Sequence, residues 1–316
     1  MSNKRQILAG HRPVCMALLI SLSAMTGAQA GPGYSPPQAF NQPGWANTQL
    51  WDINSAGQLV GQSSSDTTGE GFVYANGLFT PIVPAGAGNS AVTGISDAGV
   101  LVGIYFSGDP DAPTSSSFIY ENGAFSDFTL PGATDVLLRR ISANGRFLTG
   151  TLSDAGNGLR GFVFDRQAAS ATLIPLTNNV ILQGVTSQGL AVGSVVGQNS
   201  FAFSFDATSG VLTPYTGGDL GTRPRFRDIN DSGLITGFSG TQAFVGTPGN
   251  WTFFDPPPGM VIALGYGLNN LGDLVGLYSG PNGEVQAFVS SPVPEPAAWA
   301  LLAGGLALLA WRRRPA

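Results

Sequence analysis

Lysine, histidine and cysteine are nearly missing from this chain of 316 residues. Each occurs once, as Lys4, His11 and Cys15, all within the first 15 residues. If that segment is removed, the remaining chain has no histidine general base, no cysteine nucleophile and no lysine Schiff base. It also lacks the ligands of a Cys or His zinc site and cannot form a disulfide. We therefore expect no cofactor and no metal, and no catalytic residues.

Charge is also scarce, at 10% of the residues. All 19 acidic residues lie after residue 30, and only eight arginines lie between residue 30 and the C-terminal tail. These are Arg139, Arg140, Arg146, Arg160, Arg166, Arg223, Arg225 and Arg227. The body is therefore acidic, which argues against nucleic acid or anionic lipid as its partner.

The N-terminus has the pattern of a secretory signal. Three positive residues open it, namely Lys4, Arg5 and Arg12. An apolar run follows at 14–24, and small residues at Ala28 and Ala30 end it, which predicts a signal helix over 1–30 and cleavage after Ala30. The alternative is a buried N-terminal helix. Residues 31–48 contain several prolines and are expected to form an extended lead-in.

Six copies of one motif occupy the body. Each copy has an apolar residue, a turn, Gly, two or three mostly apolar residues and a second Gly, as in Ile53 to Gly61. The middle glycines are Gly57, Gly99, Gly145, Gly189, Gly233 and Gly272, so the period is 39 to 46 residues. Every turn begins with Asn, Ser or Thr, which can accept a backbone hydrogen bond, and its Gly supplies a positive φ. The third copy has one extra residue, which suggests a β-bulge.

A second marker, a small residue followed by Phe, comes later in each copy, and Asn-Gly pairs at 76–77 and 122–123 predict hairpins. One unit therefore holds about four short strands, as at 92–95, 101–105, 118–120 and 124–128. Six such units predict an all-β domain over 49–291, most simply a six-bladed β-propeller. A flatter solenoid or sandwich is the alternative. The last unit is one strand short, so we expect the lead-in near residues 39–40 or 49–53 to complete it.

The spacing of the motif and of the later Phe resembles the HAF-type extracellular repeats of bacteria over about residues 50–291. The resemblance implies an exported, repeat-built protein without an established reaction. One feature differs, because no histidine precedes the small residue and Phe in any copy.

The C-terminus, residues 292–316, has three parts in order. They are the motif Pro294, Glu295 and Pro296, an uncharged run at 297–311, and a basic cluster of Arg312, Arg313 and Arg314. Fifteen helical residues span about 22 Å, less than the roughly 30 Å core of a bilayer. The arginines would keep the end of this transmembrane helix in the cytoplasm.

This tail closely resembles the PEP-CTERM sorting signal. The resemblance implies Sec export, an inner-membrane intermediate, and cleavage near the motif by an exosortase, a membrane cysteine protease. The protein would then reach the cell surface or the medium of a Gram-negative bacterium that secretes exopolysaccharide. A plain membrane anchor is the alternative.

Candidate chemistry in the body is sparse. Asp109 and Asp111, with Asp97 nearby, could hold calcium, but two carboxylates are few for an ion that takes six to eight oxygens. Glu70 near Asp66 is a similar pair. The arginines at 139–140 and 223–227 could bind an acidic sugar, although surface positions are the commoner reading. Four aromatic residues could stack on sugars, namely Trp45, Trp51, Trp251 and Tyr266.

We expect a non-enzymatic surface or biofilm-matrix protein that associates with exopolysaccharide or cell-surface material. The alternative is a secreted carbohydrate-active enzyme that uses carboxylates on one face of a propeller. Two carboxylates about 5–10 Å apart in a deep pocket with aromatic walls would favour the enzyme.

Overall fold

The computed structural model describes residues 33–293, apart from 66, 110–111, 134, 155–157, 177–178 and 198–199. Its regular structure there consists of β-strands, which confirms the all-β prediction. None of the described segments is a helix that is long and apolar enough to cross a membrane. The predicted signal helix, the Pro-Glu-Pro motif and the apolar tail lie outside the described residues.

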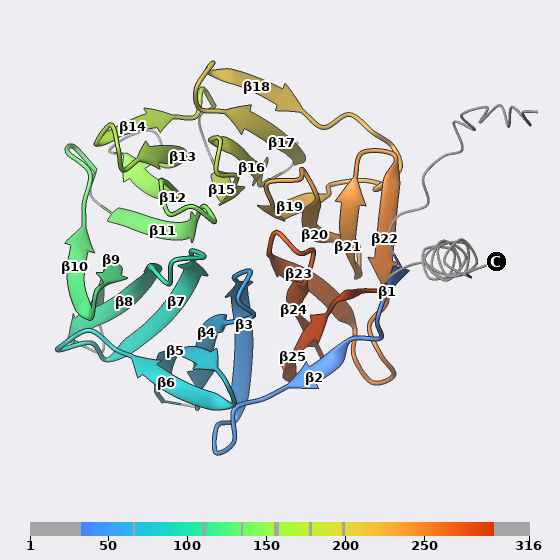
Figure 1. Cartoon of the computed structure of the whole chain (residues 1–316), viewed down its shortest axis with the longest axis horizontal. Coiled ribbons are helices and arrows are strands. Elements are labelled where there is room, and N and C mark those ends of the chain that lie inside the picture. The colour runs from blue at the N-terminus through green and yellow to red at the C-terminus, as the bar shows by residue number, and fades with distance from the viewer. Residues whose placement is uncertain are drawn as a thin grey trace, which may run out of the picture. The chain divides into compact units, whose positions relative to one another are not determined.

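The strands form antiparallel sheets arranged around a centre, as in a β-propeller (Figure 1). Three four-stranded sheets follow the order of the chain. They are β11 (Asp135–Ile141), β12 (Phe147–Asp154), β13 (Gly158–Asp165) and β14 (Ser170–Leu173); β15 (Val180–Val185), β16 (Leu190–Val195), β17 (Phe201–Asp206) and β18 (Val211–Pro214); and β19 (Arg225–Ile229), β20 (Ile235–Ser239), β21 (Gln242–Thr247) and β22 (Asn250–Phe254).

The predicted six separate sheets are not what the structure contains. The first two repeats form one eight-stranded sheet, so four separate four-stranded sheets remain. The large sheet contains β3 (Asn47–Ile53), β4 (Leu59–Ser64), β5 (Gly69–Ala75), β6 (Leu78–Ile82), β7 (Asn89–Ile95), β8 (Leu101–Asp109), β9 (Ala112–Glu121) and β10 (Ala124–Phe128). Its halves join through one parallel pair, Gly69 with Asn89. This link arises because the β5 edge reaches the start of β7.

The fourth four-stranded sheet closes the ring with a strand from the N-terminal side. Its order is β2 (Gln38–Phe40), β25 (Val285–Ser290), β24 (Leu274–Ser279) and β23 (Ile262–Leu268). The prediction that residues near 39–40 complete the last unit is thus confirmed, with Ala39 opposite Phe288. The other candidate, 49–53, lies in β3 instead. A two-stranded sheet of β1 (Gly33–Tyr34) and β26 (Pro292–Val293) adds a second contact between the two ends.

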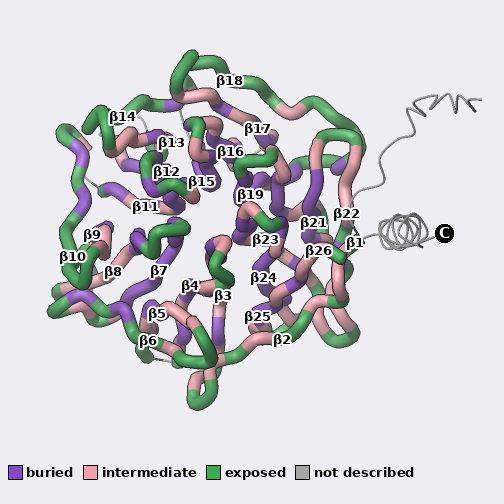
Figure 2. The backbone as a smooth tube through the Cα atoms, in the orientation of Figure 1, coloured by how far each residue is buried: buried purple, intermediate pink, exposed green. Residues whose placement is uncertain are grey.

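The two sequence markers meet inside every repeat. The second Gly of each motif lies directly across from the Phe of the second marker. A Cβ on Gly150 or Gly276 would be 2.7 or 2.6 Å from the tip of its Phe ring. The ring therefore covers a backbone that has no side chain of its own. These Phe residues are buried between neighbouring sheets, so the core follows the ring (Figure 2).

The strand nearest the centre carries a bulge in every repeat. These inner strands are β3, β7, β11, β15, β19 and β23 (Figure 1), and the pairing of each with its neighbour shifts by a residue before the motif begins. The bulge expected after Gly145 is absent, because β12 pairs with β13 in continuous register. The extra residue lengthens the turn instead, so that Ser142 N reaches Phe147 O.

Candidate functional site

The bulges turn consecutive side chains toward the central channel, because a bulge re-aims the residues of its strand. The residue just before each motif forms a layer across the channel. Around the ring it alternates between a charged residue and Gly, in the order Asp52, Gly94, Arg140, Gly184, Asp228 and Gly267. This alternation gives the six repeats a threefold pattern at their centre.

Each glycine of this layer leaves room for the charged residue of the next repeat. A Cβ on Gly184 would be 2.6 Å from the Cα of Asp228, and one on Gly267 would be 2.6 Å from the Cα of Asp52. On Gly94 it would be 3.1 Å from the Cα of Arg140. The close approach of backbones, rather than a positive φ, is what requires glycine here.

Arg140 is the centre of this layer and is only 2% exposed. Its Nη2 donates to the carbonyl oxygens of Trp51 and Tyr266 at 2.6 and 2.7 Å, and its Nη1 donates to Thr93 O at 2.5 Å. One guanidinium thereby joins the inner strands β3, β7 and β23 to its own strand β11.

Two buried carboxylates flank this guanidinium. The Nε of Arg140 lies 3.6 Å from Asp228 Oδ2 and 4.0 Å from Asp52 Oδ1. Asp52 accepts the N–H groups of Ile53 and Ile95, both at 2.9 Å. Asp228 likewise accepts from the residue after it and from Leu268 in the next repeat. Each carboxylate therefore ties two neighbouring inner strands together.

Burial raises the pKa of Asp52 to about 7 and that of Asp228 to about 6, because the channel interior disfavours charge. Arg140 opposes the rise in both cases, and Asp228 adds to it for Asp52. Loss of hydration is therefore the main reason that both carboxyls hold a proton more tightly, and the nearby Asp228 is a further reason for Asp52.

The turns that follow the inner strands form a mouth at one end of the channel. Asn54, Asn230 and Asn269 each accept the backbone N–H two residues on, as the sequence predicts. Their amides also reach the next repeat, and Asn269 donates to Asn54 O to complete the circle. The predicted positive φ is present too, at 74° for Gly57 and at 77 to 90° for the middle glycines of the other five copies.

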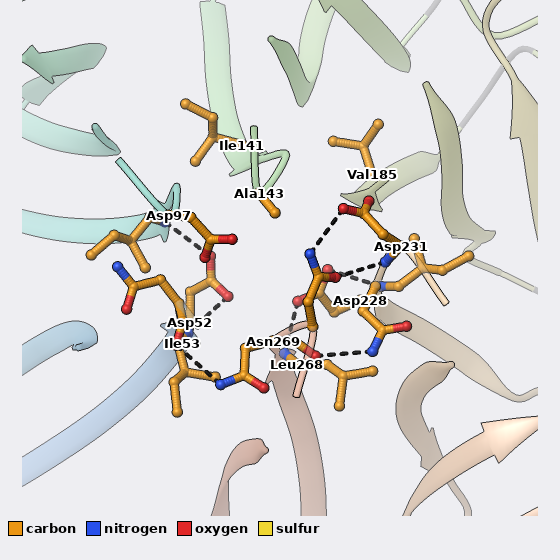
Figure 3. Close-up of a pocket in the computed structure, with 15 residues that line it drawn as sticks. Asp52, Ile53, Asp97, Ile141, Ala143, Val185, Asp228, Asp231, Leu268 and Asn269 are labelled. Atoms are coloured by element: carbon orange, nitrogen blue, oxygen red, sulfur yellow. Dashed lines mark hydrogen bonds between the residues drawn. The ribbon is translucent and has the colours of Figure 1, made fainter. Parts of the chain in front are cut away.

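A small polar cavity of about 30 Å³ lies inside this mouth (Figure 3). Asp97 and Asp231 stand on its two sides, above Asp52 and Asp228. Both rim carboxylates are already bound, because Ser55 donates N–H and O–H to Asp97 and Ser187 does the same to Asp231. The cavity has space for a water molecule or two and not for a sugar ring.

The other end of the channel has the opposite charge. The bulge residues there include Trp51, Arg139, Arg227 and Tyr266, all half-buried. Trp51 and Tyr266 pack with ring centroids 5.1 Å apart, and the Arg227 guanidinium lies 5.0 Å from the centroid of Tyr266. Beside them a cavity of about 290 Å³ opens between β15 and β19, lined in part by Arg225. We call this end the arginine vestibule, made of Trp51, Arg139, Arg225, Arg227 and Tyr266.

Several candidates from the sequence are placed differently or are not described. Asp97 accepts hydrogen bonds from Ser55 at the mouth of the channel. Asp111 and Asp66 lie outside the described residues, as do the sorting and cleavage residues of the two ends. Among the residues that the structure describes, no group of three metal-binding side chains is found. Trp251 packs on Phe244 in the core of its sheet, whereas Trp51 and Tyr266 do meet in the channel.

The buried pair of Asp52 and Asp228 was missed from the sequence. A signal for it was present, because the residue before the motif alternates between charge and Gly in all six copies. A carbohydrate-active enzyme was expected to need two nearby carboxylates and a deep pocket with aromatic walls. Asp52 and Asp228 meet the first condition, since they lie close together. The second is not met, because no aromatic residue lines the cavity above them.

Comparison with known proteins gives one family match, the PEP-CTERM protein-sorting motif at residues 292–314. The prediction of this sorting motif is confirmed, whereas the HAF-type resemblance stays a prediction. No curated protein matches the chain.

Comparison with solved structures finds similar chains at low identity. TolB from Acinetobacter baumannii has 9% identity and a TM-score of 0.46, over 77% of this chain and 63% of its own. The Cps50 (Swd1) β-propeller domain of Myceliophteria thermophila has 10% identity and a TM-score of 0.48, over 82% of this chain and 100% of its own. The gluconolactonase XC5397 from Xanthomonas campestris has 13% identity and a TM-score of 0.46, over 84% of this chain and 97% of its own. This chain thus spans less than two thirds of the TolB chain.

Proposed function

We propose that this protein is an exported, non-enzymatic surface or matrix protein that an exosortase processes at its C-terminal tail. The observation that carries the proposal is the PEP-CTERM motif at 292–314, which begins in β26 and directly follows the last strands of the propeller. The Sec machinery would export the chain, the inner membrane would hold it transiently, and the body would then associate with exopolysaccharide.

We also propose that the body works as a six-bladed propeller built from HAF-type repeats, in which the eight-stranded sheet counts as two blades. Its two halves keep the strand order of the separate sheets and share a single bridging pair. The repeated inner strand, turn and Gly–Phe pair support this count.

A role in binding rather than catalysis is supported by the state of the carboxylates. Asp52 and Asp228 each accept two backbone N–H groups, so their oxygens are already engaged. A general acid or base has to reach the proton that it transfers. The cavity above them, about 30 Å³, leaves no room for a glycosidic bond beside them.

The sorting step is tested by following the protein in cells that contain an exosortase. The parent should appear first as a full-length membrane form and later as a shorter form at the surface or in the medium. A variant with Pro294, Glu295 and Pro296 replaced by Ala should stay in the inner membrane at full length. A deletion of 294–316 should enter the periplasm without the membrane stage.

The matched control is Asp255→Ala, an exposed change in the body that leaves the tail intact. It should be sorted like the parent. Unchanged surface delivery of the deletion variant, or normal shortening of the Ala-substituted motif, would remove the sorting proposal.

A further inference from the structure

Arginines are concentrated in the channel although the body is acidic. Four of the eight body arginines, Arg139, Arg140, Arg225 and Arg227, come from the two inner strands β11 and β19. Arg140 uses its hydrogen bonds to hold the fold together. The other three belong to the arginine vestibule, where Arg225 donates to Val195 O and the side chains of Arg139 and Arg227 make no hydrogen bond within the described part of the chain.

The unpaired polar atoms of the vestibule are all donors. Trp51 Nε1, Arg139 Nε and Arg227 Nε are shut off from solvent without an acceptor among the described residues. Burial lowers the pKa of both arginines, Arg139 is lowered further by Arg227 and Arg140, and no described carboxylate offsets these effects. Buried donors ordinarily have partners, so this cluster of unpaired donors without a described carboxylate acting on it is a local excess of positive charge, which an anion held by the same arginines would offset.

The aromatic rings around Arg227 favour a planar oxyanion as the ligand. The Arg227 guanidinium lies between the rings of Tyr266 and Phe238, at 5.0 and 5.3 Å from their centroids, which fixes its plane. A fixed guanidinium binds planar oxyanions through two parallel hydrogen bonds. The adjoining cavity of about 290 Å³ is close to the lower limit of small-molecule sites, about 300 Å³.

The amide of Gln183 lines the same cavity and makes no hydrogen bond through its side chain within the described part of the chain. It adds a polar group that can both donate and accept, as sugar hydroxyls require. Apolar contacts come from Ile181 and Phe226. A ligand that fits this lining has an anionic group, hydroxyls and an apolar face.

We propose that the arginine vestibule binds the carboxylate of an acidic sugar residue, a hexuronate, with Arg139 and Arg227 on the carboxylate and the cavity beside Gln183 on the sugar ring. Arg225 lies at the start of β19 and adds positive charge at the entrance. The source of such a ligand, an acidic exopolysaccharide, rests on the proposed function, whereas the site itself is independent of it.

The test is calorimetric titration of the purified full chain with glucuronate, and with glucose, acetate and sulfate as comparison ligands. Glucuronate should bind, glucose should not, and acetate should bind at least about tenfold more weakly because it lacks the ring. R139Q and R227Q should each weaken glucuronate binding at least about tenfold. R146Q is the matched control, since it removes the same charge from an exposed position paired with Asp165 and should bind like the parent.

Sulfate or acetate binding as tightly as glucuronate would overturn the sugar assignment, and no binding of any anion would overturn the site. If R227Q does not fold, the salt dependence of glucuronate binding to the parent chain tests the site instead. Raising the salt from about 20 mM to about 500 mM should weaken binding of an anion to arginine. An affinity for glucuronate that does not change with salt would contradict the proposal. These results do not depend on tail processing, so a failed site and a failed sorting step are told apart.

Discussion

Replacement of Arg140 by Met tests whether one guanidinium holds the inner strands together. Met fills a similar length without charge, so the change leaves three carbonyl oxygens, of Trp51, Thr93 and Tyr266, without their donor. It also leaves Asp52 and Asp228 without the positive charge between them. Breaking a buried ion pair by removing one partner costs about 3–5 kcal/mol.

We expect R140M to lose about that much stability, which corresponds to a fall in melting temperature of about 6–20 °C for a domain of this size. The assay is urea unfolding of the purified chain, followed by tryptophan fluorescence, with thermal melting by circular dichroism as a second probe. R140K should lose less, because it keeps the charge although a lysine reaches fewer of the carbonyls.

The matched control is R139M, one residue away in the same strand. The Arg139 side chain makes no hydrogen bond within the described residues, and its loss relieves repulsion with Arg227. We expect its stability to stay within about 1 kcal/mol of the parent. If R140M unfolds at the same urea concentration as R139M, the central role of Arg140 is wrong.

Two further predictions concern the same layer. Gly184→Ala should destabilise the chain by about 1–3 kcal/mol or more, because the new Cβ would lie 2.6 Å from the Cα of Asp228. Gly218→Ala is the control, since a Cβ there would have no atom within 4 Å, and it should leave the melting temperature unchanged. Equal melting temperatures for the two variants would contradict the packing account. The raised folded-state pKa values of Asp52 and Asp228, about 7 and 6 against 3.8 for a free carboxyl, mean that the folded chain binds protons more tightly. Their ionisation therefore costs stability above pH 7, and this cost disappears as the pH falls through 7 and 6 toward 4. Urea midpoints should rise between pH 8 and pH 5 in the parent and rise less in D52N and D228N; an equal rise in all three would exclude these carboxyls as the cause.

The sequence predicts the local parts of this fold well, because they depend on residues close together in the chain. Asn54 and Gly57 define their turn through one side-chain acceptor and one positive φ, and neither requires knowledge of the rest of the molecule. The missing strand at the end of the last repeat likewise pointed to the lead-in, since a sheet edge needs a partner.

The joining of the first two repeats could not be predicted in this way. It depends on whether Gly69 and Asn89 come within hydrogen-bonding reach, which is decided by how two sheets sit against each other. A single pair of residues then changes the number of separate sheets without changing the pattern of the strands.

The role of Arg140 was hidden for a different reason. Adjacent residues of a regular strand point to opposite faces, so Arg139 and Arg140 would be expected to divide between surface and interior. The bulge between Leu138 and Arg140 brings both to the channel, with Arg140 in the central layer and Arg139 in the arginine vestibule. Bulges have weak sequence signals, and only comparison of all six copies reveals that the position before the motif is special.

The closing strand β2 also determines where the gene can be shortened for recombinant production. A fragment that starts after Phe40 would leave the backbone of β25 exposed along one side, which invites pairing with a second molecule and aggregation. A fragment that stops at Val293 keeps every strand of that sheet. The same sheet therefore needs the chain from Gln38 at one end and through Ser290 at the other.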